Sequence, residues 1–130
     1  MSRLFESTAI GSMTLKNRFV RSATFEGMAA PDGACTSRLI ELTAELARGE
    51  VGLIITGYAY LNRHGRSRHA QLGVYSDELI SGLTRMADAV HTEGGKVVIQ
   101  IAHSGCNSWV IPQGRKAGGP SAIVNRLGHL

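Results

Sequence analysis

Two polar side chains stand at the end of an apolar run and suggest a ligand-binding position. The segment 95–105, GKVVIQIAHSG, reads as a strand that delivers Gln100 and His103 at its carboxyl end. A desolvated amide without a partner costs on the order of 1–3 kcal/mol, so a glutamine in such a strand needs one. Parallel α/β proteins place ligand-binding side chains at this end of their strands. The segment therefore predicts hydrogen bonding to a ligand.

Metal binding and disulfide chemistry are disfavoured. His103 and Cys106 form an H-x-x-C arrangement, but no second ligand pair accompanies them, which argues against structural zinc. Cys35 and Cys106 show no close pairing motif, and the amino terminus, MSRLFESTAIG, lacks the apolar core of a signal peptide. No apolar run approaches the roughly 18 residues of a membrane span. We therefore expect a cytoplasmic protein with reduced thiols and no membrane partner.

Composition is typical of one soluble globular domain. The chain has 130 residues, of which 43% are hydrophobic and 18% are charged, with a net charge of +4. The basic residues are scattered except for Arg63, Arg66 and Arg68, which have two histidines but no aromatic residues among them. A nucleic-acid patch is one interpretation of this cluster. A solvated loop is the favoured one, so no nucleic-acid partner is expected.

The first half of the chain predicts a hairpin, a strand and a helix. Residues 7–17 alternate polar and apolar types around Gly11-Ser12, which is typical of a small hairpin, and 19–24 is a strand candidate. A helix is expected over roughly 37–48, with Thr36 as its N-cap and Gly49 at its end.

The second half repeats a strand–helix–strand pattern. The apolar run 51–56 fits a strand of a parallel sheet, and the long loop 57–74 that follows is long enough to be functional. Ser76 caps the next expected helix, whose apolar positions run from Leu79 to Val90, and Gly94-Gly95 ends it. The third strand is expected over 96–102.

The order β-α-β-α-β implies parallel strands with right-handed crossovers. A Rossmann sheet is the main competitor, and it would need G-x-G-x-x-G directly after the first strand. The segment SATFEGMAAPDG (22–33) lacks that pattern. Barrel geometry is therefore favoured.

Four segments in the same order resemble the amino-terminal part of the old yellow enzyme family, the FMN-dependent NADH:flavin oxidoreductases. They are LKNRFV (15–20), GEVGLIITGYAYLNRHGR (49–66), GVYSDELISGLTRMADAVHTEGGKVVIQIAHSG (73–105) and GGPSAI (118–123). The resemblance covers roughly residues 4–123 and implies an α/β fold, a TIM barrel that stacks FMN on the carboxyl ends of its strands. It implies an N-terminal hairpin plus the first three βα units of the (β/α)8 barrel.

The resemblance also implies the positions that contact the cofactor. These are Ser22, Ala23, Thr24, Phe25, Gly57, Tyr58 and Gln100. Backbone N–H groups near the flavin would stabilise negative charge in the reduced cofactor. The amide of Gln100 both donates and accepts, which matches the alternating N and C=O groups of the flavin pyrimidine. His103 is expected to contact substrate.

The chain departs from the family pattern in three ways. The proline and the cysteine or threonine that often follow the first strand are replaced by Ala23 and Phe25, and the arginine that often follows the HAG-like turn is replaced by Cys106. A complete barrel needs roughly 250 residues. Residues 124–130 do not continue the family pattern, so we expect 1–130 to be a partial FMN-binding domain from a truncated chain, a gene fragment or a shifted reading frame.

Three functions remain open from the sequence. The leading hypothesis is an oxidoreductase that passes hydride from NAD(P)H through FMN to an activated alkene or another small-molecule acceptor. The second is a silent fragment that self-associates through exposed sheet edges or pairs with another barrel piece. The third, a different phosphate-binding TIM barrel, is disfavoured because no Gly-rich phosphate loop is present. The 130-residue chain by itself is expected to be inactive and to bind FMN weakly or not at all.

Overall fold

The computed structural model describes residues 3–111, 116, 118, 119 and 121. A one-turn 3-10 helix, Arg3–Phe5, leads into the antiparallel hairpin of β1 (Thr8–Ile10) and β2 (Met13–Leu15). Gly11 makes the turn with a φ of 58°, a conformation that favours glycine. The hairpin expected over 7–17 is therefore confirmed.

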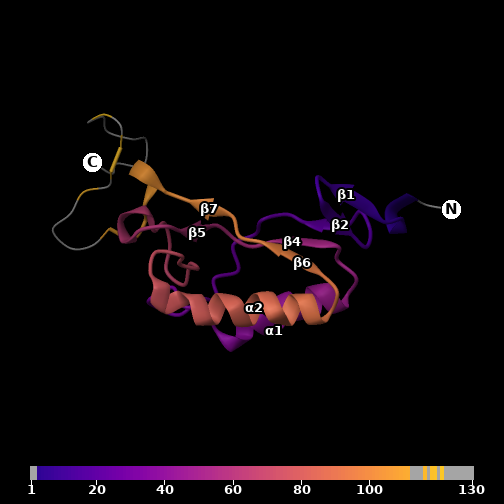
Figure 1. Cartoon of the computed structure of the whole chain (residues 1–130). Coiled ribbons are helices and arrows are strands. Elements are labelled where there is room, and N and C mark those ends of the chain that lie inside the picture. Colours follow the sequence, from indigo (N-terminus) through magenta and orange to yellow (C-terminus); the bar gives the residue numbers. More distant parts are fainter. Residues whose placement is uncertain (1–2, 112–115, 117, 120, 122–130) are drawn as a thin grey trace.

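A three-stranded parallel sheet carries the rest of the fold (Figure 1). Its strands, in the order in which they are hydrogen-bonded, are β3 (Val20–Arg21), β4 (Leu53–Ile55) and β6 (Lys96–Val98). The helices α1 (Ser37–Arg48) and α2 (Ile80–Thr92) make the two connections between them. The predicted β-α-β-α-β order is confirmed.

Both helices lie on the same side of this sheet in Figure 1. On that side Ile54 of β4 is fully buried against Ala47 of α1 and Val90 of α2. The strand neighbours of Ile54 alternate with it, so their side chains point to the other face. On that face Leu53 of the central strand is buried, whereas the edge strands are open, since Val20 is 47% exposed and Val98 is 42% exposed. The sheet is therefore covered by helices on one face only.

The first helix begins and ends where its sequence predicts. Thr36 adopts extended backbone, and its hydroxyl oxygen accepts the N–H of Leu39 at 3.3 Å. Gly49 follows the last helical residue, and its N–H donates to Glu45 O. The second helix differs at its start: a 3-10 turn, Asp77–Leu79, precedes α2, and the side chain of Ser76 makes no capping hydrogen bond. Ile80, the first residue of α2 and one of the apolar positions of the expected helix, is exposed.

The start of β3 is tied to the end of α1 through the LKN part of the first motif. The Asn17 amide donates to Glu50 O at 2.6 Å and accepts the N–H of Phe19 at 3.0 Å. A Cβ on Gly52 would lie 2.6 Å from the Asn17 side-chain oxygen, so this position needs a glycine. Lys16 donates to Ala47 O at 3.1 Å. These motif residues therefore have a structural role.

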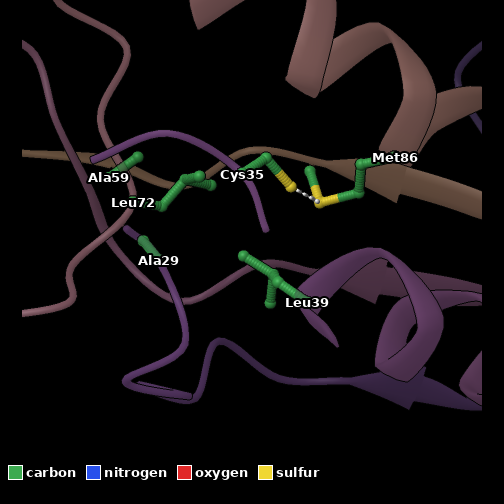
Figure 2. Packing of buried hydrophobic residues seen from close by; sticks show 6 residues of the cluster. All are labelled: Ala29, Cys35, Leu39, Ala59, Leu72 and Met86. Atoms are coloured by element: carbon green, nitrogen blue, oxygen red, sulfur yellow. Dashed lines mark hydrogen bonds between the residues drawn. The ribbon is translucent and has the colours of Figure 1, made fainter. Parts of the chain in front are cut away.

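A second core lies between the helices and the long loop. Figure 2 shows its six buried residues, which are Ala29, Cys35, Leu39, Ala59, Leu72 and Met86. The sulfur atoms of Cys35 and Met86 are 3.8 Å apart. Burial raises the pKa of the Cys35 thiol to about 11, with a smaller opposing effect from Arg85. Packing on both sides of Cys35 thus anchors the loop that precedes α1.

Two expectations about the strands are wrong in part. The third strand does not run unbroken over 96–102: β6 ends at Val98, and the separate strand β7 (Ile101–Ala102) pairs in parallel with β5 (Ala59–Tyr60). Strand β5 lies inside the segment 57–74 that was expected to be a loop, as does a 3-10 helix, Arg63–Gly65. The chain changes partner because β4 ends at Ile55, so the residues after Val98 continue beside the next extended segment.

Several expectations concern the carboxyl end. Of the motif 118–123, the structure describes Gly118, Gly119 and Ser121, and 124–130 lies outside the described residues. The last described 3-10 helix is Gly105–Asn107. None of the helices in the described ranges combines the length and apolar character that crossing a membrane requires.

Candidate active site

All the sequence-predicted site residues lie at the carboxyl end of the parallel strands. The segment Ser22–Phe25 follows β3 directly, and Gly57 and Tyr58 follow β4 after a single residue, Thr56. Gln100 lies between β6 and β7, and His103 follows β7. Because parallel strands end at the same edge, three segments distant in sequence meet there.

Gly57 allows two of these segments to touch. A Cβ at this position would lie 2.6 Å from the carbonyl oxygen of Thr24 and 3.2 Å from the Cα of Phe25. It would also collide with the carboxylate of Glu26. The rings of Phe25 and Tyr58 then meet with centroids 5.5 Å apart. The close approach of backbone to backbone explains why the residue after β4 is a glycine.

Thr56 joins the end of β4 to the segment that carries Gln100. Its buried hydroxyl donates to Gly57 O at 2.9 Å and accepts the backbone N–H of Gln100 at 3.3 Å. The carbonyl of Gln100 accepts the N–H of Ala59 at 2.7 Å. The backbone of Gln100 is therefore held on both sides, while its side chain is exposed and its amide is open to a ligand.

His103 lies against the long loop. Its ring packs on Gly65, where an added Cβ would collide with it, and its Nδ1 accepts the N–H of Gly105 at 3.0 Å. In a neutral imidazole this assigns the proton to Nε2, which can then donate. His103 is exposed, so this donor can reach a ligand. Gln100 is thus fixed by Thr56, directly after β4, and by β5, whereas His103 is fixed by the loop.

The hydroxyl of Thr24 is engaged locally. It donates to the carbonyl of Ser22 at 3.1 Å, within the segment that the resemblance assigns to the flavin. Ala23 is half-buried, and Ser22, Thr24 and Phe25 are exposed. The segment therefore presents backbone and an aromatic ring.

Sequence reasoning missed Gln71, which is almost fully buried. Its side-chain oxygen accepts the N–H groups of Ser67 at 2.7 Å and Arg68 at 3.1 Å, and its amide nitrogen donates to Tyr58 O at 3.2 Å. This one side chain fastens the long loop to the residue that follows Gly57. The signal available from sequence was a polar residue beside apolar ones, which does not identify its partners.

The basic cluster is mostly exposed, as expected for a solvated loop, but its side chains also make defined contacts. The guanidinium of Arg63 lies 5.1 Å from the ring centroid of Tyr75, and that of Arg66 lies 5.5 Å from the ring centroid of Tyr60. Arg66 also donates to Pro31 O at 2.9 Å and Arg68 O at 3.0 Å. These contacts hold the cluster against the body of the protein.

Tyr60 is buried beneath this cluster. It stacks on Tyr75 with centroids 5.1 Å apart, and its hydroxyl donates to Asp32 O at 2.8 Å. Burial raises the pKa of Tyr60 to about 12, and nearby Arg66 acts in the opposite direction. The phenol therefore serves packing and stays protonated at ordinary pH.

An open hollow of about 410 Å³ lies beside the predicted site. It is lined by Phe25, Arg68, His69, Trp109 and Val110. The guanidinium of Arg68 lies 5.6 Å from the ring centroid of Trp109. Hydrophobic and aromatic walls with a few polar groups are typical of small-molecule sites.

The sequence matches the family model described as the NADH:flavin oxidoreductase / NADH oxidase family over residues 3–126. It is 37% identical over 122 residues to the 4,4'-dithiodibutanoate disulfide reductase of Rhodococcus erythropolis, covering 94% of this chain and 30% of that protein. It is 38% identical over 104 residues to the NADPH dehydrogenase of Bacillus subtilis, covering 79% of this chain and 31% of that protein.

Solved structures agree with these matches. Morphinone reductase in complex with tetrahydroNAD has a TM-score of 0.81 at 26% identity, covering 95% of this chain and 34% of that one. A 2-naphthoyl-CoA reductase complex has a TM-score of 0.87 at 26% identity, covering 95% of this chain and 21% of that one. The chain thus spans about a third or less of the length of these relatives.

Proposed function

The chain belongs to the NADH:flavin oxidoreductase / NADH oxidase family, and we propose that it forms one wall of an FMN site in an NAD(P)H-dependent oxidoreductase of the old yellow enzyme type. The observation that carries this proposal is the meeting of Ser22–Phe25, Gly57-Tyr58 and Gln100 at one end of the parallel sheet. We further propose that the hairpin precedes the barrel and that β3, β4 and β6 begin the first three of its eight β-α units.

The residues at this end fit a flavin. The exposed amide of Gln100 can donate and accept on the polar edge of the isoalloxazine, since its backbone is already bonded to Thr56 and Ala59. The backbone of Thr24 and Phe25 lies close to Gly57, beside the Glu26 carboxylate. Backbone N–H groups that face the ring would favour negative charge on it.

When bound, FMN would supply hydride transfer from NAD(P)H to an acceptor. This chain's residues would orient the ring and exclude water from one side of it. His103, whose Nε2 can donate, would contact the acceptor at the rim. The relatives are named for acceptors as different as disulfides and morphinone, so the acceptor is proposed only as a small molecule.

A second candidate function is association with another barrel piece. The observations that favour it are the open sheet face, where Val20 and Val98 are about half exposed, and the separate strand β7, where Ile101 is 63% exposed. β3 and β6 are both edge strands of the parallel sheet. Such edges and faces are covered in complete α/β proteins.

One comparison tests both candidates. The complete gene product that carries this chain and the 130-residue chain are purified separately, and each is titrated with FMN and then with NADH or NADPH without oxygen. We expect the complete product to bind flavin stoichiometrically and to lose its visible absorbance on reduction. We expect the 130-residue chain to bind FMN weakly and to associate. If the complete product does not bind flavin, the enzyme proposal is contradicted. If the 130-residue chain is a monomer saturated with flavin, the proposal that it holds only part of the FMN site is contradicted.

A further inference from the structure

A half-buried ion pair joins the two ends of the segment that follows β3. Arg21 Nη1 lies 3.1 Å from Glu26 Oε1, and the two side chains are 18% and 11% exposed. Arg21 is the last residue of β3, and Glu26 follows Ser22–Phe25. The pair therefore closes a four-residue arc of backbone at the candidate active site.

Further contacts restrict the same arc. Arg21 Nη1 also donates to Ser22 O at 3.4 Å, and this carbonyl accepts the hydroxyl of Thr24 at 3.1 Å. The chain turns immediately after Glu26, because Gly27 has a φ of 63°. The arc thus begins at a strand end and finishes at a turn that favours glycine, with the ion pair across its base.

Glu26 and the arc also contact the segment that follows β4. A Cβ on Gly57 would collide with the Glu26 carboxylate as well as with the Thr24 carbonyl oxygen. The Glu26 carboxylate and the Thr24–Phe25 backbone therefore both lie against Gly57. Any change in the direction of this carboxylate alters how the arc rests on Gly57.

Stability by itself is a weak reason for such a pair. Two charges mostly removed from water lose hydration that their attraction only partly restores. The pair of Arg48 with Glu41 on the surface of α1 is different, since its side chains are 54% and 62% exposed. A desolvated pair is better explained where it holds one backbone conformation that a ligand needs.

We propose that Arg21 and Glu26 are positioning residues for the flavin: their ion pair holds the Ser22–Phe25 backbone in the conformation that faces the ring. The pair thereby sets the affinity for FMN and the reduction potential of the bound cofactor, because both depend on where the backbone dipoles point. This inference rests on the proposed function. Neither residue touches the cofactor in this role.

The test is a double-mutant cycle in the complete gene product. The variants are Arg21→Gln, Glu26→Gln and the two combined, with Glu41→Gln as the matched control on the exposed pair. The FMN dissociation constant is measured by quenching of flavin fluorescence, and the flavin reduction potential is measured on the loaded protein. Thermal unfolding without FMN reports the purely structural effect.

We expect each single variant to raise the FMN dissociation constant about tenfold or more, since a small displacement of a positioned group has effects of this size. The combined variant should lose no more FMN affinity than either single variant, because the same interaction is removed in all three. The reduction potential should shift in the same variants. Glu41→Gln should bind FMN as the unchanged protein does.

Three results would overturn the inference. One is that the single variants have the FMN affinity and the reduction potential of the unchanged protein. That result would contradict the role of the ion pair but not the proposed flavin binding. Another is a lower unfolding temperature with no change in affinity or potential, which would make the pair structural only. The third is a loss of FMN affinity in the combined variant that equals the product of the two single losses, which would show that the residues act independently. If the unchanged complete product binds no FMN, the proposed function fails and this inference fails with it.

Discussion

The hydroxyl of Thr56 accepts the backbone N–H of Gln100 across 3.3 Å, at the point where the chain leaves β6 and continues toward β7. The same hydroxyl donates to Gly57 O. One buried side chain therefore connects two of the three segments that make the candidate site. Removal of the Thr56 hydroxyl should therefore affect the segment of Gln100 first.

Thr56→Val is predicted to destabilise the fold by about 1–3 kcal/mol, because the Gln100 N–H loses its acceptor while the side-chain shape is kept. Hydrogen exchange measured at the Gln100 amide should accelerate in this variant. Thr56→Ser keeps the hydroxyl and should keep the amide protected. Equal exchange at Gln100 in the two variants would show that the hydroxyl does not hold this segment.

Gly57→Ala is predicted to cost about 1–3 kcal/mol, because the backbone of Thr24 must shift to admit a methyl group. The free energy of unfolding is measured by urea titration. Gly118, around which a Cβ would meet nothing within 4 Å, provides the control. Gly118→Ala should change stability by less than about 0.5 kcal/mol. Similar values for both substitutions would contradict the close approach at Gly57.

The Cys35 thiol is predicted to resist modification in the folded protein. Burial raises its pKa to about 11, so at pH 8 only about one thiol in a thousand is ionised. A Cys106→Ser variant leaves Cys35 as the one cysteine, and a thiol reagent should then react only after urea is added. Rapid labelling without urea would contradict the packing of Cys35 against Met86.

Tyr60 is predicted to make the fold less stable at high pH. Its pKa is about 12 in the folded chain and about 10 in the unfolded chain, so between these values the unfolded chain binds fewer protons. The contribution of Tyr60 is complete below pH 10 and is lost as pH rises to 12. Between pH 9 and pH 11 the loss is about 1.3 kcal/mol.

The measurement is urea unfolding at pH 9, 10 and 11. Tyr60→Phe loses the hydrogen bond to Asp32 O at every pH but has no phenol to titrate. The stability difference between the unchanged chain and Tyr60→Phe should therefore shrink as pH rises. Parallel pH curves for the two proteins would assign the alkaline loss to other groups.

The open sheet face is predicted to drive association of the 130-residue chain. Val98→Lys puts a charge on this face and should shift sedimentation toward a smaller species. Ile80→Lys is the control, since Ile80 is 54% exposed on α2, outside the sheet. Equal behaviour of the two variants would show that the sheet face is not the contact.

The sequence by itself determined the elements whose signals are local. The spacing of apolar residues with Thr36 and Gly49 at the ends was sufficient to predict α1, because capping and helical periodicity act within a few residues. The apolar run around Ile54 was sufficient to predict β4. The placing of Gln100 and His103 at a strand end also came from the sequence pattern, whereas Ser22–Phe25, Gly57 and Tyr58 were assigned through the family resemblance.

Tertiary structure alone decided the rest. The change of partner after Val98, the anchoring of the long loop by Gln71 and the closure of the arc by Arg21 and Glu26 leave no periodic mark in the sequence. Gln71 and Tyr58 are 13 residues apart, and Thr56 and Gln100 are 44 apart. Such contacts depend on which strand ends at which residue, and a local pattern carries no information about a partner that only folding brings near.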